Sequence, residues 1–252
     1  MQPPDPKQGE RDYFARIGPE GIAHTLRKPF SDDHCAHYLA SMTALFNLLP
    51  PPPLRVVEFG CGTGWLALAL AQRGYSVLGV DISEDAVCHA RATAASRGLD
   101  NIEYRAADYE HFDGAGTFDF AIFHDALHHA EDEIAALRCA YAALRPGGCV
   151  IALEPGSGHD ATPASVRAVT EFGVHEKCMP PAHIIRSARA AGFSRHLVLP
   201  TPHELNRLVY RRAYHASPSQ ADLFGRWTLS LFRSLWHLGK SRWDPGLVLL
   251  WK

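Results

Sequence analysis

The sequence predicts a doubly wound α/β fold, in which helices cover both faces of a mostly parallel sheet. From residue 54 onward, strand-like runs alternate with helix-like segments: LRVVEF precedes WLALALAQRG, and SVLGVD precedes a helix that begins after Ser83. A glycine-rich turn joins the first run to its helix. Because a strand, a helix and a second strand in succession form a parallel βαβ unit, the alternation favours an α/β sheet.

Five further apolar runs complete the predicted sheet. IEYRAAD and FDFAIF predict the third and fourth strands, and EDEIAALRCAYAAL predicts the helix that follows them. CVIALE predicts a fifth strand, which starts after the turn at residues 146–148. PPAHIIRSARAAG predicts another helix, and FSRHLVL and GLVLLWK predict the last two strands. Seven strands are therefore expected.

The length of 252 residues suits one large domain with additions at both ends. Residues 1–53 predict a tail and a helical cap: 1–10 are polar and proline-rich and are expected to fray, and the helical spacing of 19–49 stops at the prolines of 50–53. We expect the core at 54–200, a helical insert or lid at 201–245, and the final core strand at 246–252.

Composition narrows the classes of function. The formal net charge of -2 offers no general attraction to phosphate backbones, so no stable nucleic-acid partner is expected. The six cysteines contain no Cys-x-x-Cys pair and are expected to be reduced thiols. Because we find neither a leader-like start nor an apolar run of membrane-spanning length, the sequence predicts a cytoplasmic protein.

The segment VVEFGCGTG, residues 56–64, predicts a turn that a ligand can approach closely. Glycines at 60, 62 and 64 permit positive φ angles and leave no Cβ between the backbone and a bound nucleoside. A dinucleotide fingerprint would need a glycine where Trp65 stands, and no phosphate-binding Gly-Lys-Ser/Thr loop follows. Asp81 and Asp108 follow the next two strands, at the sheet edge where ligands of such folds bind.

Together these segments resemble class I S-adenosylmethionine-dependent methyltransferases, in particular the type 11 and type 25 domain families. The similarity runs in register over about residues 54–155, through VEFGCGTG, VDIS, AADY, FDFAIFHDALHHAED and LRPGGCVIALEP. It implies a Rossmann-like, seven-stranded methyltransferase sheet whose last strand is antiparallel. It also implies S-adenosyl-L-methionine as the cofactor.

The resemblance assigns the methionine part of that cofactor to the glycine loop. Gly60, Gly62 and Gly64 would hold it. Glu58 would face its ammonium group, directly or through a water, and the region of His124 would offer backbone to the same amine.

The nucleoside part would lie along the second and third strands. The resemblance implies that Asp81 binds the ribose hydroxyls and that Ile82 packs on the adenine. Asp108 would accept a hydrogen bond from the exocyclic amine, with Tyr109 adjacent.

Histidines gather after the fourth predicted strand, beside the expected methyl donor. If the acceptor is a hydroxyl, a base can take its proton as the methyl group arrives. The candidates are His128, Glu154 and His159, with His128 slightly favoured by its place after the strand. His124 and His128 have i, i+4 spacing, but His124 falls at a strand end, so no metal site is expected.

The predicted helix at 220–239 is amphipathic, with Arg226 and Arg233 on its basic side. We expect it to pack as a lid with a solvated charged face. A weak contact with a membrane surface, or with an anionic substrate, is the alternative.

The sequence thus predicts a methyltransferase that acts on a small molecule or a glycan- or lipid-linked metabolite, at oxygen or nitrogen. One alternative is a nucleoside-binding or scaffold protein of the same fold without turnover. Another is a protein or RNA methyltransferase, although the fourth-strand segment lacks the Asn/Asp-Pro-Pro-aromatic signature of many amino-group nucleic-acid methylases. The oligomeric state stays open.

Overall fold

The computed structural model describes residues 5–114, 116–201, 228, 229, 232 and 244–252. Within them, seven strands form one sheet in the order β3-β2-β1-β4-β5-β7-β6. The strands are β1 (Arg55–Phe59), β2 (Ser76–Asp81), β3 (Ile102–Ala106), β4 (Phe118–His124), β5 (Leu144–Leu153), β6 (Arg195–Pro200) and β7 (Gly246–Trp251). Strands β1 to β5 pair in parallel, and β7 is antiparallel to both β5 and β6. The predicted fold class is confirmed.

Helices pack on both faces of the sheet and beyond the ends of its strands. They are α1 (Gln8–Arg16), α2 (Gly18–Leu26), α3 (Cys35–Leu48), α4 (Trp65–Arg73), α5 (Glu84–Ser96), α6 (Glu133–Ala143), α7 (Pro163–Phe172) and α8 (Pro181–Ala191), with short 3-10 turns η1 (Tyr109–His111) and η2 (Leu127–His129). Ser83 caps α5 by accepting from the N–H of Ala86, and Asp132 caps α6 in the same way. Each cap satisfies backbone donors that a helix start leaves without partners.

The buried residues form two layers, one on each face of the sheet. On one face α6 and α8 cover the sheet with small and branched residues such as Leu137 and Ile184. On the other face α3, α4 and α5 contribute Leu45, Leu70 and Val87. Because both faces are buried, the central strands are continuously apolar, which is the pattern that made them recognisable in the sequence.

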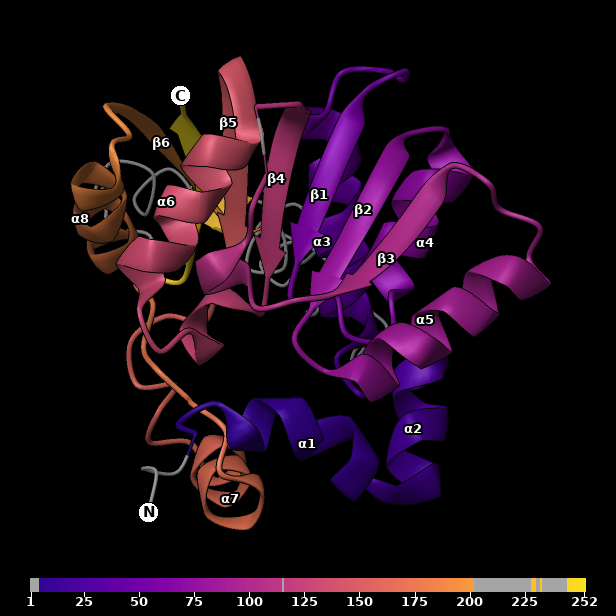
Figure 1. Ribbon diagram of the computed structural model, residues 1–252. Coiled ribbons are helices and arrows are strands. Elements are labelled where there is room, and N and C mark those ends of the chain that lie inside the picture. The colour runs from indigo at the N-terminus through magenta and orange to yellow at the C-terminus, as the bar shows by residue number, and fades with distance from the viewer. Residues whose placement is uncertain (1–4, 115, 202–227, 230–231, 233–243) are drawn as a thin grey trace.

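One expectation about the N-terminus was wrong. Residues 7–10 do not fray: Lys7 is buried and α1 begins at Gln8. Figure 1 shows α1 beside α7, across the edge where the parallel strands end. Arg16 of α1 donates hydrogen bonds to the carbonyls of Glu171 and Phe172 at the end of α7, which holds the two helices together. The sequence analysis did not predict α7.

Most of the predicted insert at 201–245 lies outside the described residues, and so do Arg226 and Arg233 of the basic helix. The proposed domain boundaries stay a prediction. Among the helices that the structure describes, none combines the length and the apolar character needed to cross a membrane.

Candidate active site

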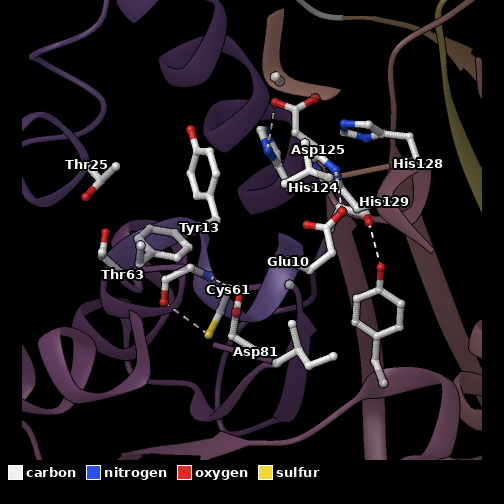
Figure 2. Close-up of a pocket in the computed structure, with 18 of the residues that line it drawn as sticks. Glu10, Tyr13, Thr25, Cys61, Thr63, Asp81, His124, Asp125, His128 and His129 are labelled. Atoms are coloured by element: carbon white, nitrogen blue, oxygen red, sulfur yellow. Dashed lines mark hydrogen bonds and ion pairs between the residues drawn. The ribbon is translucent and has the colours of Figure 1, made fainter. Parts of the chain in front are cut away.

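A cavity of about 440 Å³ opens at the carboxyl ends of β1, β2 and β4. Its volume lies within the roughly 300–1,000 Å³ of small-molecule sites. Figure 2 places Cys61 and Thr63 of the glycine loop at one end of the cavity and His128 and His129 at the other. Nine residues singled out from the sequence line it: Gly60, Gly62, Asp81, Ile82, Asp108, Tyr109, His124, His128 and His159.

The glycine loop forms one wall of the cavity through its backbone. Gly60 and Gly62 have φ angles of 71° and 52°, in the left-handed region that favours glycine. A Cβ on Gly60 would lie 2.5 Å from the Cβ of Ala126, so the loop tolerates no side chain there. Gly64 lies apart from the cavity, because the space beside its Cα is filled by the Tyr104 hydroxyl.

Asp81 links the loop to the end of β2. Its side chain is buried, and its two oxygens accept hydrogen bonds from the N–H groups of Gly62 (2.7 Å) and Ser83 (2.9 Å). Burial raises the pKa of this carboxyl, and the two backbone donors oppose that rise. The Asp81 carboxyl lies at the cavity wall with Ile82 beside it, where a ligand's hydroxyl groups would meet it.

Glu58 lies behind the loop, and it is absent from the cavity lining. Its carboxyl bonds to the backbone of Ala67 in α4, and burial raises its pKa to about 8. Its Oε2 atom has no hydrogen-bond partner among the described residues. The Glu58 carboxyl therefore does not line the cavity, and its expected position facing the cofactor ammonium, directly or through a water, stays a prediction.

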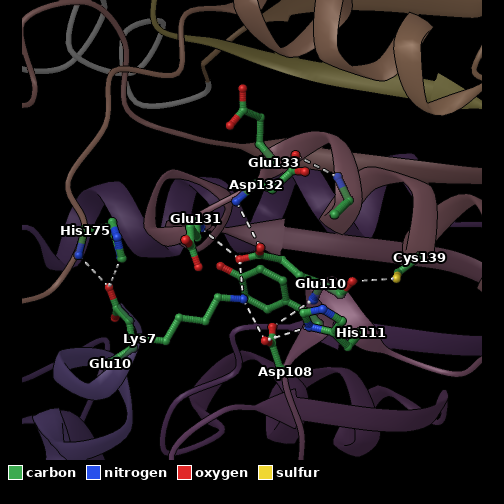
Figure 3. A network of polar contacts seen from close by, with 12 residues as sticks. Lys7, Glu10, Asp108, Glu110, His111, Glu131, Asp132, Glu133, Cys139 and His175 are labelled. Carbon is green, nitrogen blue, oxygen red and sulfur yellow. Dashed lines mark hydrogen bonds and ion pairs between the residues drawn. The ribbon is translucent and has the colours of Figure 1, made fainter. Parts of the chain in front are cut away.

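Asp108 is held by a buried lysine that the sequence analysis took for part of a tail. Lys7 Nζ lies 2.6 Å from Asp108 Oδ2 and 2.8 Å from Glu110 Oε1 (Figure 3). Burial disfavours the charged carboxylate, but the hydrogen bond from Lys7 lowers the pKa of Asp108 below its ordinary value. Asp108 also caps η1 through the N–H of Glu110 (3.0 Å), and Tyr109 donates to the carbonyl of Ala126 (2.9 Å).

His124 ends β4 and lines the middle of the cavity. Its ring packs edge-on against Trp65, at 5.4 Å between ring centroids, and lies 5.9 Å from the ring of Tyr38. Its Nε2 is buried and has no hydrogen-bond partner among the described groups. Asp125, the next residue, adopts a φ of 49°, which is uncommon for a residue with a side chain.

His128 and Glu154, two of the three base candidates, form a buried pair. Nδ1 of His128 lies 2.8 Å from Glu154 Oε2, and the same carboxylate accepts from the N–H groups of Ala126, Leu127 and His128. Burial lowers the pKa of His128 to about 3, so its ring is neutral and Nδ1–H donates to the carboxylate. Glu154 itself lies behind His128, outside the cavity lining.

His159, the third base candidate, lies near His128 and bonds to Glu176, a residue that the sequence did not point to. Its Nε2 lies 2.6 Å from Glu176 Oε2, and Nε2 of His128 lies 3.7 Å from that oxygen. His129 stacks at a tilt against His128, at 4.0 Å between centroids. Glu10 of α1 lies 3.5 Å from His129 Nδ1. Desolvation opposes a charged imidazole, yet the hydrogen bond to Glu10 raises the pKa of His129 to about 9.

Residues 56–148 match the sequence profile of a family described as "Methyltransferase domain". They contain the glycine loop, strands β2 to β4, nearly all of β1 and the first half of β5. The chain contains a class I methyltransferase domain. The match ends before α7 and the cluster residue Glu176, so the methyltransferase profile covers the glycine-loop side of the cavity more fully than the histidine side.

Curated relatives include ubiquinone biosynthesis O-methyltransferases. The chain is 32% identical over 150 residues to the protein of Brucella anthropi and 38% identical over 148 residues to that of Methylocella silvestris. These alignments cover 55% and 56% of this chain and 60% and 57% of the relatives. The methyltransferase domain is thus shared, but the chain spans less than two thirds of either relative.

Solved structures share the fold at low identity. The Haemonchus contortus phosphoethanolamine N-methyltransferase 2, solved with S-adenosyl-L-methionine, superposes with a TM-score of 0.65 at 17% identity, covering 96% of this chain and 59% of that one. The cyclase SpnF superposes with a TM-score of 0.61 at 21% identity, covering 99% and 97%. Since proteins described by different reactions share this fold, the fold alone does not decide the chemistry.

Proposed function

We propose that this protein is an S-adenosyl-L-methionine-dependent methyltransferase that methylates a small molecule, with a hydroxyl oxygen as the favoured acceptor and an amine as the alternative. The observation that carries the proposal is the division of one cavity into two chemically different ends. One end is a backbone cradle with an acidic partner, and the other is a cluster of imidazoles and carboxylates. The names of the curated relatives support oxygen as the acceptor atom.

The glycine loop is shaped to hold the cofactor, because two of its residues carry no side chain. A Cβ on Gly60 would collide with Ala126, and one on Gly62 would lie 3.3 Å from Phe14 of the cavity lining. The loop therefore presents bare backbone to the cavity, as a closely approaching ligand requires. Gly60 and Gly62 would hold the methionine part, and Asp81 with Ile82 would hold the ribose and one face of the adenine. When bound, the cofactor supplies a methyl group on a positively charged sulfur.

Asp108 and Tyr109 would complete the nucleoside end. Asp108 already bonds to Lys7 through Oδ2 and to the N–H of Glu110 through Oδ1. A carboxylate oxygen can accept more than one hydrogen bond, so the adenine amine would share Asp108 with Lys7. The protein's contribution to methyl transfer is then positioning and the exclusion of water. Residues of α1 and α7, including Tyr13, Phe14 and Ala168, line the cavity and are placed for both.

At the other end, His128 is the group best placed to take a proton from an acceptor hydroxyl. Glu154 fixes its Nδ1–H, and its Nε2 points to the side of the cavity where Glu176 and His159 lie. The neutral ring of His128 has a lone pair on Nε2 for the proton. Because burial lowers its pKa to about 3, it is a weak base and would take the proton only as the methyl group arrives. An amine acceptor that is already unprotonated would need no such help before it attacks.

The experiment that tests this function measures binding and turnover separately. Calorimetry with S-adenosylhomocysteine and with NADH should show binding of the first alone. Transfer of labelled methyl groups should then be assayed on phenols, amines and a lipid-linked phenol. Tight binding with no transfer to any acceptor would favour a nucleoside-binding protein of this fold, and transfer only to protein or RNA would reject the small-molecule class.

The finer expectations stay proposals. A glycan- or lipid-linked acceptor, a cytoplasmic location, and a surface contact through residues 220–239 are not tested by the described residues. The oligomeric state is likewise open.

A further inference from the structure

Three side chains at the histidine end of the cavity point polar atoms at one another without a hydrogen bond linking all three. They are His128, His129 and Glu176, and one nitrogen or oxygen of each lies within 4.8 Å of the others. Nε2 of His128 and Oε2 of Glu176 are 3.7 Å apart, which is too long for a hydrogen bond. Two ligands at about 2.0–2.2 Å from one tetrahedral ion would lie roughly 3.4 Å apart. The observed separation is close to that of two ligands of a shared ion.

Both histidines are held from behind through Nδ1. His128 bonds to the Glu154 carboxylate at 2.8 Å, and His129 bonds to the backbone carbonyl of His175 at 2.6 Å. Metal-binding histidines almost always donate their second ring N–H to a carboxylate or a carbonyl, which fixes the tautomer and leaves the other nitrogen free for the ion. His128 has this arrangement, and His129 would have it once the ion takes the place of the proton on its other ring nitrogen.

The carboxylate of the trio is oriented too, and its surroundings favour a positive charge. Glu176 Oε2 bonds to His159 Nε2 at 2.6 Å, and the Glu176 side chain is only 10% exposed. Glu10 brings a second carboxylate to within 3.5 Å of His129 Nδ1. Carboxylates that are taken out of water need a compensating cation.

We propose that His128, His129 and Glu176 bind a divalent transition-metal ion, with Zn²⁺ as the best match. Two imidazoles and one carboxylate suit zinc, whereas Mg²⁺ and Ca²⁺ prefer oxygen ligands alone. Three protein ligands are the usual number in catalytic zinc sites, which leave a fourth position open. The i, i+4 spacing of His124 and His128 does not define this site, because the structure places His129 and Glu176 beside His128.

The consequence for catalysis rests on the proposed function. An acceptor hydroxyl at the open position would lose its proton to water more easily, because the ion stabilises the resulting oxyanion. That oxygen would form the bond to the methyl carbon, while the carbon–sulfur bond breaks and its electron pair stays on sulfur. With the ion bound, Nε2 of His128 is a metal ligand, and it no longer serves as the base.

Metal binding can be measured on the full chain without turnover. The protein is stripped with a chelator and titrated with Zn²⁺ by calorimetry and with Co²⁺ by visible absorption. We expect one ion per chain and, for Co²⁺, a visible band of tetrahedral type. Glu176→Gln and His129→Gln should each weaken binding by about tenfold or more, and the loss of an outer partner in Glu154→Gln should weaken it by about 10–100-fold.

His196→Ala is the matched control, because this histidine is exposed on β6, away from the cavity, and should bind the ion as the wild type does. S-adenosylhomocysteine binding, measured on every variant, shows which variants are folded and tests the cofactor proposal independently. If the wild type takes up no stoichiometric ion, or if folded Glu176→Gln and His129→Gln bind it as tightly as the wild type does, the metal site is wrong. The methyltransferase proposal would then stand with His128 as base.

Discussion

Replacing Asp81 by asparagine tests the nucleoside end of the cavity most directly. The carboxylate is only 8% exposed and accepts from the N–H groups of Gly62 at 2.7 Å and Ser83 at 2.9 Å. Asparagine keeps the shape but turns one acceptor oxygen into an NH₂ group, which would face one of these backbone donors. It also removes the negative charge of the carboxylate, whose oxygens would accept hydrogen bonds from the ribose hydroxyls.

The expected size of the effect follows from these contacts. A hydrogen bond to a charged group contributes about 1.5–3 kcal/mol. Because about 1.4 kcal/mol corresponds to a tenfold change in affinity, S-adenosylhomocysteine should bind about 10- to 150-fold more weakly. The unsatisfied backbone N–H should lower the free energy of unfolding by about 1–3 kcal/mol.

Calorimetry with S-adenosylhomocysteine and urea unfolding measure the two effects separately. Ser83→Ala is the matched control, since it removes the N-cap bond to Ala86 (3.4 Å) and leaves the Asp81 carboxylate in place. It should cost about 1 kcal/mol of stability and leave ligand affinity unchanged. If folded Asp81→Asn binds S-adenosylhomocysteine as tightly as the wild type does, Asp81 is not part of the cofactor site.

Two further predictions concern stability. Lys7→Met leaves the buried carboxylate of Glu110 and the partly buried one of Asp108 without their cation, and it should lower the free energy of unfolding in urea by about 1–3 kcal/mol. Arg11→Met, at an ion pair about 40% exposed, should change that free energy by less than about 1 kcal/mol. Equal losses would mean that the Lys7 contacts do not stabilise the fold. Burial opposes the charge of Glu133, but hydrogen bonds from a histidine and a lysine lower its pKa to about 2 from 4.5. The stability that comes from this depressed pKa is complete above about pH 4.5 and is lost as the pH falls toward 2. Glu133→Gln should therefore lose less free energy of unfolding than the wild type between about pH 6 and pH 3. Parallel pH profiles of the two proteins in urea unfolding would refute this.

Much of the fold and half of the cavity could be predicted from the sequence, because their signals are local. Apolar runs of strand length, glycines at positive φ in the loop, and the cap of Ser83 are each set by residues close together in the chain. The carboxyl ends of parallel strands meet at one sheet edge, so Asp81 and Asp108 could be placed near the glycine loop before any coordinates were known.

Only the tertiary structure decided which groups close the cavity. Lys7 contacts Asp108 across 101 positions of sequence, and α6, β5 and α7 separate His128 from Glu176. No local sequence pattern predicts either contact. Tertiary packing also decided that the Glu58 carboxyl bonds to the backbone of α4 and does not line the cavity. The sequence by itself determined the sheet, the glycine loop and its acidic partners through local periodicity and backbone freedom. The packing of α1, α7 and the 174–179 segment against the strand ends decided which elements cover the cavity and which side chains join the histidines. Buried charges find their partners only after distant elements have docked.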